Sequence, residues 1–298
     1  MDENAALIDR FEEDRGRLRA VAYRMLGSVS EAEDAVQETW LRVSRADTGS
    51  VENLSGWLTT VVSRICLNML RKRESRREEP LEVRAPQPAT GPEDGSDPEQ
   101  EALLADSVGV ALLVVLDTLA PAERLAFVLH DLFAVPFDEI GPMIERSPTA
   151  ARQLASRARR RVKGGAAAPA PDADLARRRR VVEAFLTATR GGDFTALLSL
   201  LHPDVVLRAD KAVVPSPEPI VVHGARPVAK GAMAAMGRAR YTGVALVDGT
   251  VGLVMAPQGR LSVALTFAVA ADGSITGIEV IAERERLAEL EVAELGDA

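Results

Sequence analysis

ERSPTAARQLASRARRR, residues 145–161, is the stretch from which the organisation of this chain can be worked out. Ser147 is a good N-cap and Pro148 suits a first helical position, so a helix is expected to begin there. At about 100° per residue, small and apolar side chains gather on one side: Ala151, Leu154, Ala155, Ala158 and Val162. Hydrogen-bonding side chains and arginines gather on the other: Thr149, Arg152, Gln153, Ser156, Arg157, Arg159 and Arg160. The alanine-rich side lets the helix pack closely on a neighbour.

A second short helix is expected just upstream, in PFDEIGPMI at 136–144, with a turn at 145–147. Two helices joined in this way are typical of a helix-turn-helix, whose second helix enters the major groove of DNA. Guanidinium groups and short hydrogen-bonding side chains suit that role because they reach base edges. A basic helix that only faces solvent would show the same pattern, so the motif alone leaves both interpretations open.

Length and composition limit the class of protein. The 298 residues allow two or three domains, and the net charge is −8. There is no run of about 20 apolar residues, and residues 1–26 are too charged for a secretory signal. The single cysteine, Cys66, excludes a disulfide framework, and its apolar neighbours indicate a buried thiol in a reducing compartment. A cytoplasmic location is therefore predicted.

The acidic residues are concentrated in one segment. Residues 78–101 contain 8 acidic residues, 1 basic residue and five prolines. Such a segment buries too little apolar surface to fold, so a flexible linker is expected. A second linker, rich in alanine, glycine and proline, is expected at 165–174. Three folded units are left, at 5–77, 102–164 and 175–298.

The first unit is expected to be all helix. An apolar stripe from Phe11 to Leu26 ends at Gly27, and Ser30 is expected to cap a second helix, EAEDAVQETWLRV at 31–43. Four residues recur at i, i+3, i+4 and i+7 on its outer side: Asp34, Gln37, Glu38 and Leu41. A leucine on an acidic stripe indicates a partner surface, although single exposed leucines are common. A partner surface and a solvated face are both compatible with this pattern.

A polar loop at 47–53 leads into a third helix that becomes basic towards its C-terminus. Its polar and basic positions are Arg64, Asn68, Arg71, Lys72, Arg73, Arg76 and Arg77. Cations at a helix C-terminus complement the helix dipole, which is the simplest explanation. Seven such residues over four turns exceed what a cap requires, so a phosphate-contacting surface is favoured.

The order of these motifs resembles the bacterial extracytoplasmic-function (ECF) sigma factors. The resemblance covers roughly half of the chain and rests on YRMLGS, EAEDAVQETWLRV, GWLTTVVSRICLNMLRKR, LDTLAPAERLAFVLHDLF and the helix-turn-helix. Members of this family are RNA polymerase subunits with two helical domains, sigma-2 and sigma-4, joined by a variable linker. The resemblance implies that the acidic linker follows the RNA exit path as a mimic of nucleic acid.

The same resemblance implies a role for each surface. The second helix would bind the clamp helices of polymerase through Asp34, Gln37, Glu38, Leu41 and Arg42. The loop 47–53 would hold a flipped-out base of the −10 element. The −10 bases and phosphates would be met by Arg64, Asn68, Arg71, Lys72 and Arg73. The −35 element would be read by Thr149, Arg152, Gln153, Ser156, Arg157 and Arg160.

The third unit departs from a minimal sigma factor. Helices are expected at 175–190, 194–201 and 227–238, strands within 202–210 and at 220–223, and an antiparallel meander at 251–281 with a hairpin at 271–273. His202–Pro203–Asp204 is expected to be the turn before the first strand. This order resembles the SnoaL-like members of the NTF2-like superfamily, and the whole chain resembles SigJ-type sigma factors. The expected fold class is multi-domain, with two all-α sigma domains and an α+β NTF2-like cone.

Motifs that members of this subgroup often carry are missing. The linker lacks a tryptophan–leucine–proline–glutamate–proline stretch, no glycine triplet follows Asp210, and Ala282–Leu287 replaces an asparagine–proline–aspartate–lysine–leucine motif. If those motifs dock the extension on the sigma domains, this chain is expected to dock differently or more weakly.

The chain is predicted not to be an enzyme. Some NTF2-like cones use an Asp or His as a general base, and the groups available here are His202, Asp204, Asp210 and His223. There is no Cys/His metal-ligand cluster, Gly-rich phosphate loop or Ser/His/Asp set, so no metal and no cofactor are predicted.

The predicted partners are core RNA polymerase, promoter DNA, and the sigma domains as an intramolecular partner of the C-terminal domain. No membrane partner is expected. An unknown small ligand of the C-terminal cavity is an open alternative, and so is an autonomous DNA-binding repressor that senses such a ligand.

Overall fold

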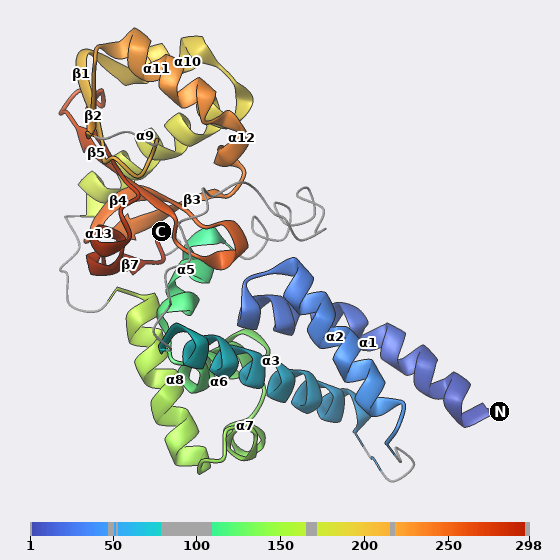
Figure 1. Ribbon diagram of the computed structural model, residues 1–298. Helices are drawn as coiled ribbons and strands as arrows, with labels where there is room; N and C mark the ends of the chain where they lie inside the picture. Colours follow the sequence, from blue (N-terminus) through green and yellow to red (C-terminus); the bar gives the residue numbers. More distant parts are fainter. Residues whose placement is uncertain are drawn as a thin grey trace. The chain divides into compact units, whose positions relative to one another are not determined.

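The computed structural model describes residues 2–46, 51, 53–78, 109–164, 172–214 and 218–295 (Figure 1). The chain divides into two compact units. The first comprises residues 1–101 and 118–159, and the second comprises residues 102–117 and 160–298. The linkers predicted at 78–101 and 165–174 lie outside the described residues, apart from Glu78 at the end of one helix and residues 172–174 at the start of another.

The N-terminal part of the first unit consists of three helices, α1 (Asp2–Leu26), α2 (Val29–Val43) and α3 (Leu54–Glu78). All three were predicted, and α1 ends as expected because Gly27 takes a positive φ of 76°. The predicted cap of α2 is wrong. Ser28, not Ser30, is the N-cap, and its hydroxyl accepts a hydrogen bond from the Glu31 backbone N–H at 3.4 Å. Ser28 and Glu31 have the spacing of a capping box, which starts the helix two residues earlier than expected.

These three helices bury one face each in a common core. The buried side chains include Leu18, Val21, Ala22, Met25, Leu26, Ala32, Ala35, Val36, Leu58, Val62, Ile65 and Cys66. The rings of Phe11 and Trp40 also pack together, with centroids 5.1 Å apart. Full burial of a Leu, Val or Ile side chain stabilises by about 1.5–3 kcal/mol, so packing of these faces holds the helices together.

The predicted helix-turn-helix is confirmed in the C-terminal part of the first unit. It follows α6 (Pro121–Phe127) and a single-turn π-helix, η1 (Val128–Leu132), and it consists of α7 (Phe137–Met143) and α8 (Pro148–Val162) (Figure 1). The Ser147 hydroxyl accepts a hydrogen bond from the Ala150 N–H at 3.2 Å, as expected for the N-cap. The turn is tight. A Cβ at Gly141 would lie 2.8 Å from the Arg146 carbonyl oxygen, so only glycine fits without a backbone shift.

A seven-stranded mixed sheet forms the centre of the second unit, in the order β2-β1-β6-β5-β4-β3-β7. Its strands are β1 (Leu201–Ala209), β2 (Ile220–His223), β3 (Thr242–Val247), β4 (Thr250–Met255), β5 (Val263–Val269), β6 (Ile275–Ile281) and β7 (Val292–Ala293). Neighbouring strands are antiparallel except β1 and β6, which run parallel.

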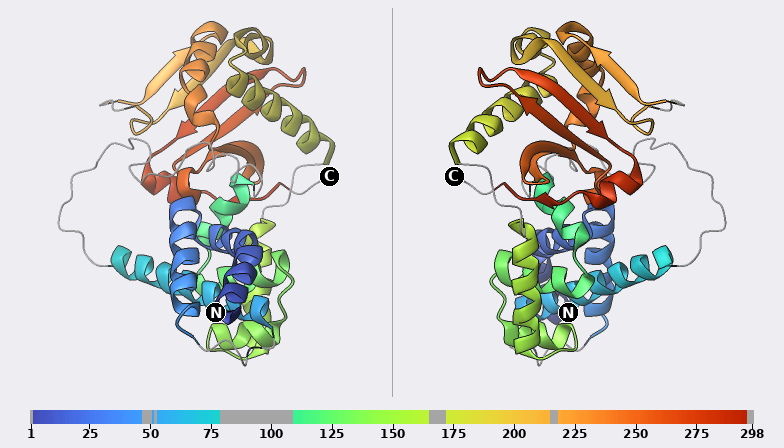
Figure 2. Two further views of the ribbon diagram at one scale, coloured as in Figure 1. Left: turned by 90° about the vertical axis from the view of Figure 1, so that its right-hand side faces the viewer. Right: turned by 90° about the vertical axis from the view of Figure 1, so that its left-hand side faces the viewer.

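Helices cover one side of this sheet (Figure 2). They are α9 (Asp172–Gly191), α10 (Phe194–Leu200), α11 (Ala225–Ala234) and the short α12 (Met236–Ala239). A 3-10 turn, η2 (Pro257–Gly259), separates β4 from β5, and α13 (Arg284–Glu289) follows β6. The predicted α+β order is therefore confirmed, although the helix expected at 227–238 is divided into α11 and α12, and β3, α13 and β7 were not predicted.

The first strand of the sheet begins earlier than expected. His202–Pro203–Asp204 lies within β1 and not in a preceding turn. The pairing of β1 with β6 shifts register between Leu201 and Val206. Pro203 has no N–H to give to a ladder, so the strand tolerates it at this irregularity.

The core of the second unit lies between the sheet and its helices. Phe185 of α9 meets Phe267 of β5 edge-on, with ring centroids 5.3 Å apart. The surrounding buried side chains include Val182, Leu186, Leu197, Val205, Val228, Val251, Leu253, Ile275 and Ile278. Apolar side chains from both layers thus fill the space between helices and sheet.

One helix of the second unit is apolar on every side over its first seven residues. It is α5 (Val110–Thr118), in which residues 110–116 are all buried. A helix of this kind must be covered all round. Part of the cover comes from β3, because a Cβ at Gly243 would lie only 2.8 Å from Cβ of Val110. No helix in the described part of the chain is long and apolar enough to cross a membrane.

We expect Cys66 to make the first unit less stable at high pH. Burial raises the pKa of its thiol to about 12, whereas an unfolded cysteine titrates near 8.5. The folded thiol therefore stays protonated, and the unfolded thiol ionises as the pH rises above about 8.5, which favours unfolding. At pH 10 the difference should approach about 2 kcal/mol.

The measurement is urea unfolding of the full chain and of Cys66→Ala between pH 7 and pH 10. Tryptophan fluorescence reports the first unit, because both tryptophans, Trp40 and Trp57, lie there. The wild-type curve should lose stability with pH more steeply than the variant. Parallel pH dependences would contradict the prediction.

Candidate nucleic-acid and partner interface

The acidic stripe of α2 lies at the surface. Asp34, Gln37, Leu41 and Arg42 are exposed and Glu38 is partly exposed. The Glu38 carboxylate pairs with Arg42 Nε at 2.9 Å, one helical turn away. Leu41 is 47% exposed, although large apolar side chains are usually covered. The five predicted residues therefore form one continuous surface.

An apolar groove of about 270 Å³ runs beside this stripe, between α1 and α2. Gln37, Trp40 and Leu41 line it from α2. Ile8, Phe11, Glu12 and Arg15 line it from α1. The contribution of α1 was missed from the sequence, although Ile8 continues the spacing of Phe11 by one turn on the same face. The stripe and the groove together form a surface with an apolar centre and a charged rim, which is the usual composition of a protein–protein interface.

The basic face of α3 is exposed as predicted at Arg64, Asn68, Arg71 and Lys72. Arg73 differs from them. Its side chain is only 18% exposed, its guanidinium pairs with Glu31, and NH1 donates to the Leu26 carbonyl at 3.1 Å. Arg73 thus ties α3 to the junction of α1 and α2, and its guanidinium is already engaged within the protein.

Two arginines link α3 and α1 to the helix-turn-helix part of the same unit. Arg64 NH2 donates to the Pro142 carbonyl at 3.4 Å, and buried Arg124 donates to the Met25 carbonyl at 2.9 Å. Of the loop predicted to hold a base, residues 47–50 and 52 lie outside the described residues. Its last residue, Asn53, accepts a hydrogen bond from Gly56 N–H at 3.0 Å and so caps α3.

The two sides of α8 are separated as the sequence predicted. Ala151, Ala155 and Ala158 have no exposed surface, and Val162 is buried beside them. All six residues predicted for the −35 element are exposed: Thr149, Arg152, Gln153, Ser156, Arg157 and Arg160. The guanidinium of Arg152 lies over the ring of Phe137 in α7, 5.3 Å from its centroid. The helix therefore presents a polar, positively charged surface on a closely packed support.

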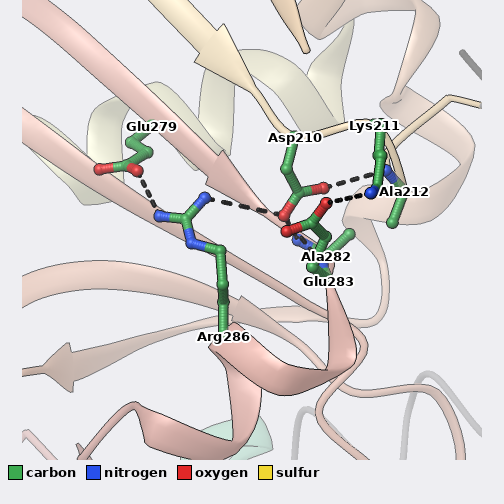
Figure 3. Close-up of polar contacts among 7 residues, drawn as sticks. All are labelled: Asp210, Lys211, Ala212, Glu279, Ala282, Glu283 and Arg286. Carbon is green, nitrogen blue, oxygen red and sulfur yellow. Dashed lines mark hydrogen bonds and ion pairs between the residues drawn. The ribbon is translucent and has the colours of Figure 1, made fainter. Parts of the chain in front are cut away.

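Asp210 in the second unit is a buried carboxylate that is held by hydrogen bonds from the backbone (Figure 3). Its side chain is 4% exposed. The carboxylate accepts hydrogen bonds from the N–H groups of Ala212, Ala282 and Glu283 at 2.7–3.2 Å. Arg286 of α13 lies 3.9 Å from it and pairs with Glu279 at 2.5 Å. Asp210 thus joins the ends of β1 and β6 to the start of α13.

The other groups weighed as general bases do not gather around Asp210. His202 and Asp204 lie within β1, where the Asp204 N–H donates to His202 Nδ1 at 3.2 Å. His223 is exposed at the end of edge strand β2. In the part of the chain that the structure describes, no three His, Cys, Asp or Glu residues are grouped so that they could hold a metal ion.

The arginine run of α9 is mostly paired. Arg177 and Arg178 both bind Asp174, at 2.6 and 2.9 Å, and Arg179 binds Glu183 at 2.7 Å. The hydrogen bonds from Arg177 and Arg178 hold the pKa of Asp174 below its usual range. These three arginines neutralise neighbouring carboxylates on their own helix.

Comparison with known protein families identifies the class to which this fold belongs. The family model described as Sigma-70 region 2 matches residues 10–76, and that described as Sigma-70, region 4 matches residues 109–162. The first match begins within α1, includes α2 and ends near the end of α3, and the second runs from α5 to the end of α8.

Two curated relatives come from Mycobacterium tuberculosis. The ECF RNA polymerase sigma factor SigJ is 44% identical over 203 residues, which are 68% of this chain and 64% of that protein. The probable ECF RNA polymerase sigma factor SigI is 38% identical over 202 residues, 67% of this chain and 69% of that protein. The solved structure of SigJ covers 94% of this chain and 98% of its own, with 33% identity and a TM-score of 0.44. The chain belongs to the ECF RNA polymerase sigma factors.

We expect Asp210→Asn to destabilise the second unit by about 1–3 kcal/mol, because a neutral amide replaces a buried carboxylate that accepts several N–H bonds. The effect should appear in urea unfolding followed by circular dichroism, and in faster hydrogen exchange of the amides of Ala282 and Glu283. Asp204→Asn, at an exposed position, is the matched control and should leave both measurements unchanged. Equal behaviour of the two variants would remove this role of Asp210.

Proposed function

We propose that this chain binds core RNA polymerase, recognises promoter −10 and −35 elements, and directs transcription initiation. The observation that carries the proposal is the exposed acidic and apolar stripe of α2 with the groove beside it. Asp34, Gln37, Glu38, Leu41 and Arg42 are the polymerase-binding residues, joined by Ile8 and Phe11 of the groove. A repressor that binds DNA by itself, the alternative from another class, needs neither this surface nor a second basic helix.

Promoter recognition is divided between two helices in this proposal. Arg64, Asn68, Arg71 and Lys72 of α3 contact the −10 element, and Arg73 acts by holding α3 against the α1–α2 junction. The outer side of α8 reads the −35 element through Thr149, Arg152, Gln153, Ser156, Arg157 and Arg160. Support comes from the exposure of these side chains and from the close packing of the opposite side.

The charge balance fits this role. A chain with a net charge of −8 has little general affinity for DNA, whereas a subunit of a larger holoenzyme does not need it. We keep the predicted division into a sigma-2 domain (5–77), an acidic linker (78–101), a sigma-4 domain (102–164), a second linker (165–174) and an NTF2-like domain (175–298). Such a factor would act in the cytoplasm, where bacterial transcription takes place.

The C-terminal domain would modulate transcription through its contact with the sigma-4 sequence. Two contacts within the second unit support this. The Glu294 N–H donates to the Val162 carbonyl at the end of α8, at 3.0 Å, and Val110 of α5 lies against Gly243 of β3. A shift of the sheet would therefore move the end of the helix that reads the −35 element.

A small-molecule ligand in the core of this domain would have to displace packed side chains such as Phe185 and Phe267. We therefore favour regulation through the contact over regulation through a ligand. No catalytic step is assigned, because the carboxylate of Asp210 is taken up by backbone N–H groups and Arg286.

Replacing Asp34 and Glu38 together by lysine should weaken assembly with core polymerase at least severalfold. Both side chains point away from the helical core, so the fold should survive. Pull-down with purified core enzyme and circular dichroism are the two measurements. Glu285→Lys with Glu289→Lys makes the same charge change at the same helical spacing in α13 and serves as the control. Unchanged affinity for core enzyme would rule out the α2 stripe as the binding surface.

Opening the contact between α5 and β3 should change promoter-dependent transcription severalfold without loss of polymerase binding. Gly243→Val does this in the full chain, because even a Cβ there would press on Val110. Removal of residues 175–298 should act in the same direction, although it also uncovers α5. Gly237→Ala, where no atom lies within 4 Å of the added Cβ, is the control.

Run-off transcription with core polymerase measures both variants. Equal transcription by wild type, Gly243→Val and the truncated chain would show the C-terminal domain to be an independent module. Reversing the charges of Arg284 and Arg286, an alternative test of docking, is less informative because Arg286 is bound to Glu279 and Asp210 inside its own domain.

A further inference from the structure

The outer side of α8 is bordered on both flanks by arginines that are held in place. At about 100° per residue, Arg157 lies on one flank of the stripe formed by Thr149, Gln153 and Arg160. Arg159 lies on the opposite flank. Arg159 was not among the residues predicted to contact the −35 element.

A carboxylate of α6 holds the first of these arginines. Glu123 Oε1 lies 3.2 Å from Nε of Arg157. The side chain of Glu123 is only 10% exposed, whereas that of Arg157 is 56% exposed. A carboxylate this buried requires charged or hydrogen-bonding partners, so Glu123 anchors the inner edge of the guanidinium.

A carboxylate of the π-helix η1 holds the second arginine, Arg159. Asp131 Oδ1 lies 2.5 Å from Nε of Arg159, and Asp131 is the less exposed of the two side chains. The wider turn of a π-helix changes the direction of the side chains that follow, and Asp131 lies within this turn. Both ion pairs use Nε, and among the described residues neither Arg157 nor Arg159 makes another hydrogen bond, ion pair or ring contact.

This arrangement leaves the two terminal nitrogens of each guanidinium available. A guanidinium has five N–H donors in a planar fork, so one edge can bind a carboxylate while the terminal groups bind a phosphate. A helix in the major groove has one phosphate backbone on each flank, and backbone contacts fix its register. Two arginines fixed on opposite flanks match that geometry.

We propose that Glu123 and Asp131 are positioning residues for −35 binding, and that they aim Arg157 and Arg159 at phosphates on opposite strands of the major groove. The central stripe then carries the contacts to base edges. This inference rests on the proposed role of α8 at the −35 element and assigns what each flank of the helix does there.

Simple electrostatics and positioning predict opposite effects of neutralising the carboxylates. Glu123→Gln and Asp131→Asn each remove a negative charge close to a DNA-binding helix, which by Coulomb attraction alone strengthens DNA binding. If the carboxylates position the arginines, the same changes weaken binding, because the freed side chains lose entropy when they reach the phosphate. The sign of the change decides between the two.

The experiment uses full-length protein assembled with core polymerase and a promoter duplex selected by this holoenzyme from a randomised library. Dissociation constants are measured over a range of KCl concentrations. Glu123→Gln and Asp131→Asn should weaken binding about two- to fivefold, the range expected for a partly exposed ion pair. Glu139→Gln and Asp138→Asn, exposed on α7, are matched charge controls and should leave binding unchanged or strengthen it.

A mutant cycle and modified DNA complete the test. Arg157→Ala should lower the slope of log K against log salt by about 1, and Glu123→Gln should add nothing in that background. One uncharged methylphosphonate on one strand should abolish the effect of Arg157→Ala. The effect of Arg159→Ala should be abolished by a methylphosphonate on the other strand.

Tighter binding by Glu123→Gln and Asp131→Asn, or sensitivity of both arginines to the same strand, overturns the proposal. So does weaker binding that persists unchanged in the arginine-to-alanine backgrounds, because the carboxylates would then act only through the fold. Gln153→Ala and Arg160→Ala test the underlying role separately. If neither affects binding that depends on the −35 sequence, the role of α8 fails, whatever the carboxylate variants do.

Discussion

The close packing of the inner side of α8 is the constraint on which the arrangement of its exposed polar and basic side depends. Three alanines there have no exposed surface, and their small size lets the helix backbone approach its neighbours. The tight turn at Gly141 fixes where the helix begins. Packing therefore sets both the distance of α8 from its neighbours and the residue at which the helix begins. Together these fix the positions of the polar side chains on its outer side. A larger inner residue would push the whole outer stripe away.

Charge in this protein is organised locally. The net charge of −8 describes neither the basic side of α8 nor the basic face of α3. Many arginines are held by carboxylates close to them in space, as Arg157 is by Glu123, Arg73 by Glu31 and Arg177 by Asp174. Such pairs keep a guanidinium in a fixed place, whereas Arg71 and Lys72 are exposed with no such pair among the described residues. The distinction separates Arg73 from Arg71 and Lys72, although all three are adjacent in the sequence.

The C-terminal domain and the sigma-4 sequence share structure through α5 and the end of α8. Residues 110–116 of α5 are all apolar and buried, so this part of the helix needs cover on every side, and β3 supplies part of it. The sheet edge at β7 then reaches Val162 through the backbone of Glu294. Asp210 holds the segment between β6 and α13, and so fixes the start of the path that leads to β7.

The sequence by itself determined the three helices of the first domain, the helix-turn-helix, the two sides of α8 and most of the elements of the cone, but not α5, α6, β3, α13 or β7. These follow from periodicity, caps and turn residues, which act over a few residues along the chain. It placed the cap of α2 at Ser30 instead of Ser28, and it placed His202–Asp204 in a turn instead of in β1. In both cases the two alternatives differ little in local preference. Only the tertiary structure decided which charged residues are paired, the contribution of α1 to the groove and the anchoring of Asp210. Those depend on residues far apart along the chain, such as Asp210 and Glu283, and distances in space between such residues are set by packing.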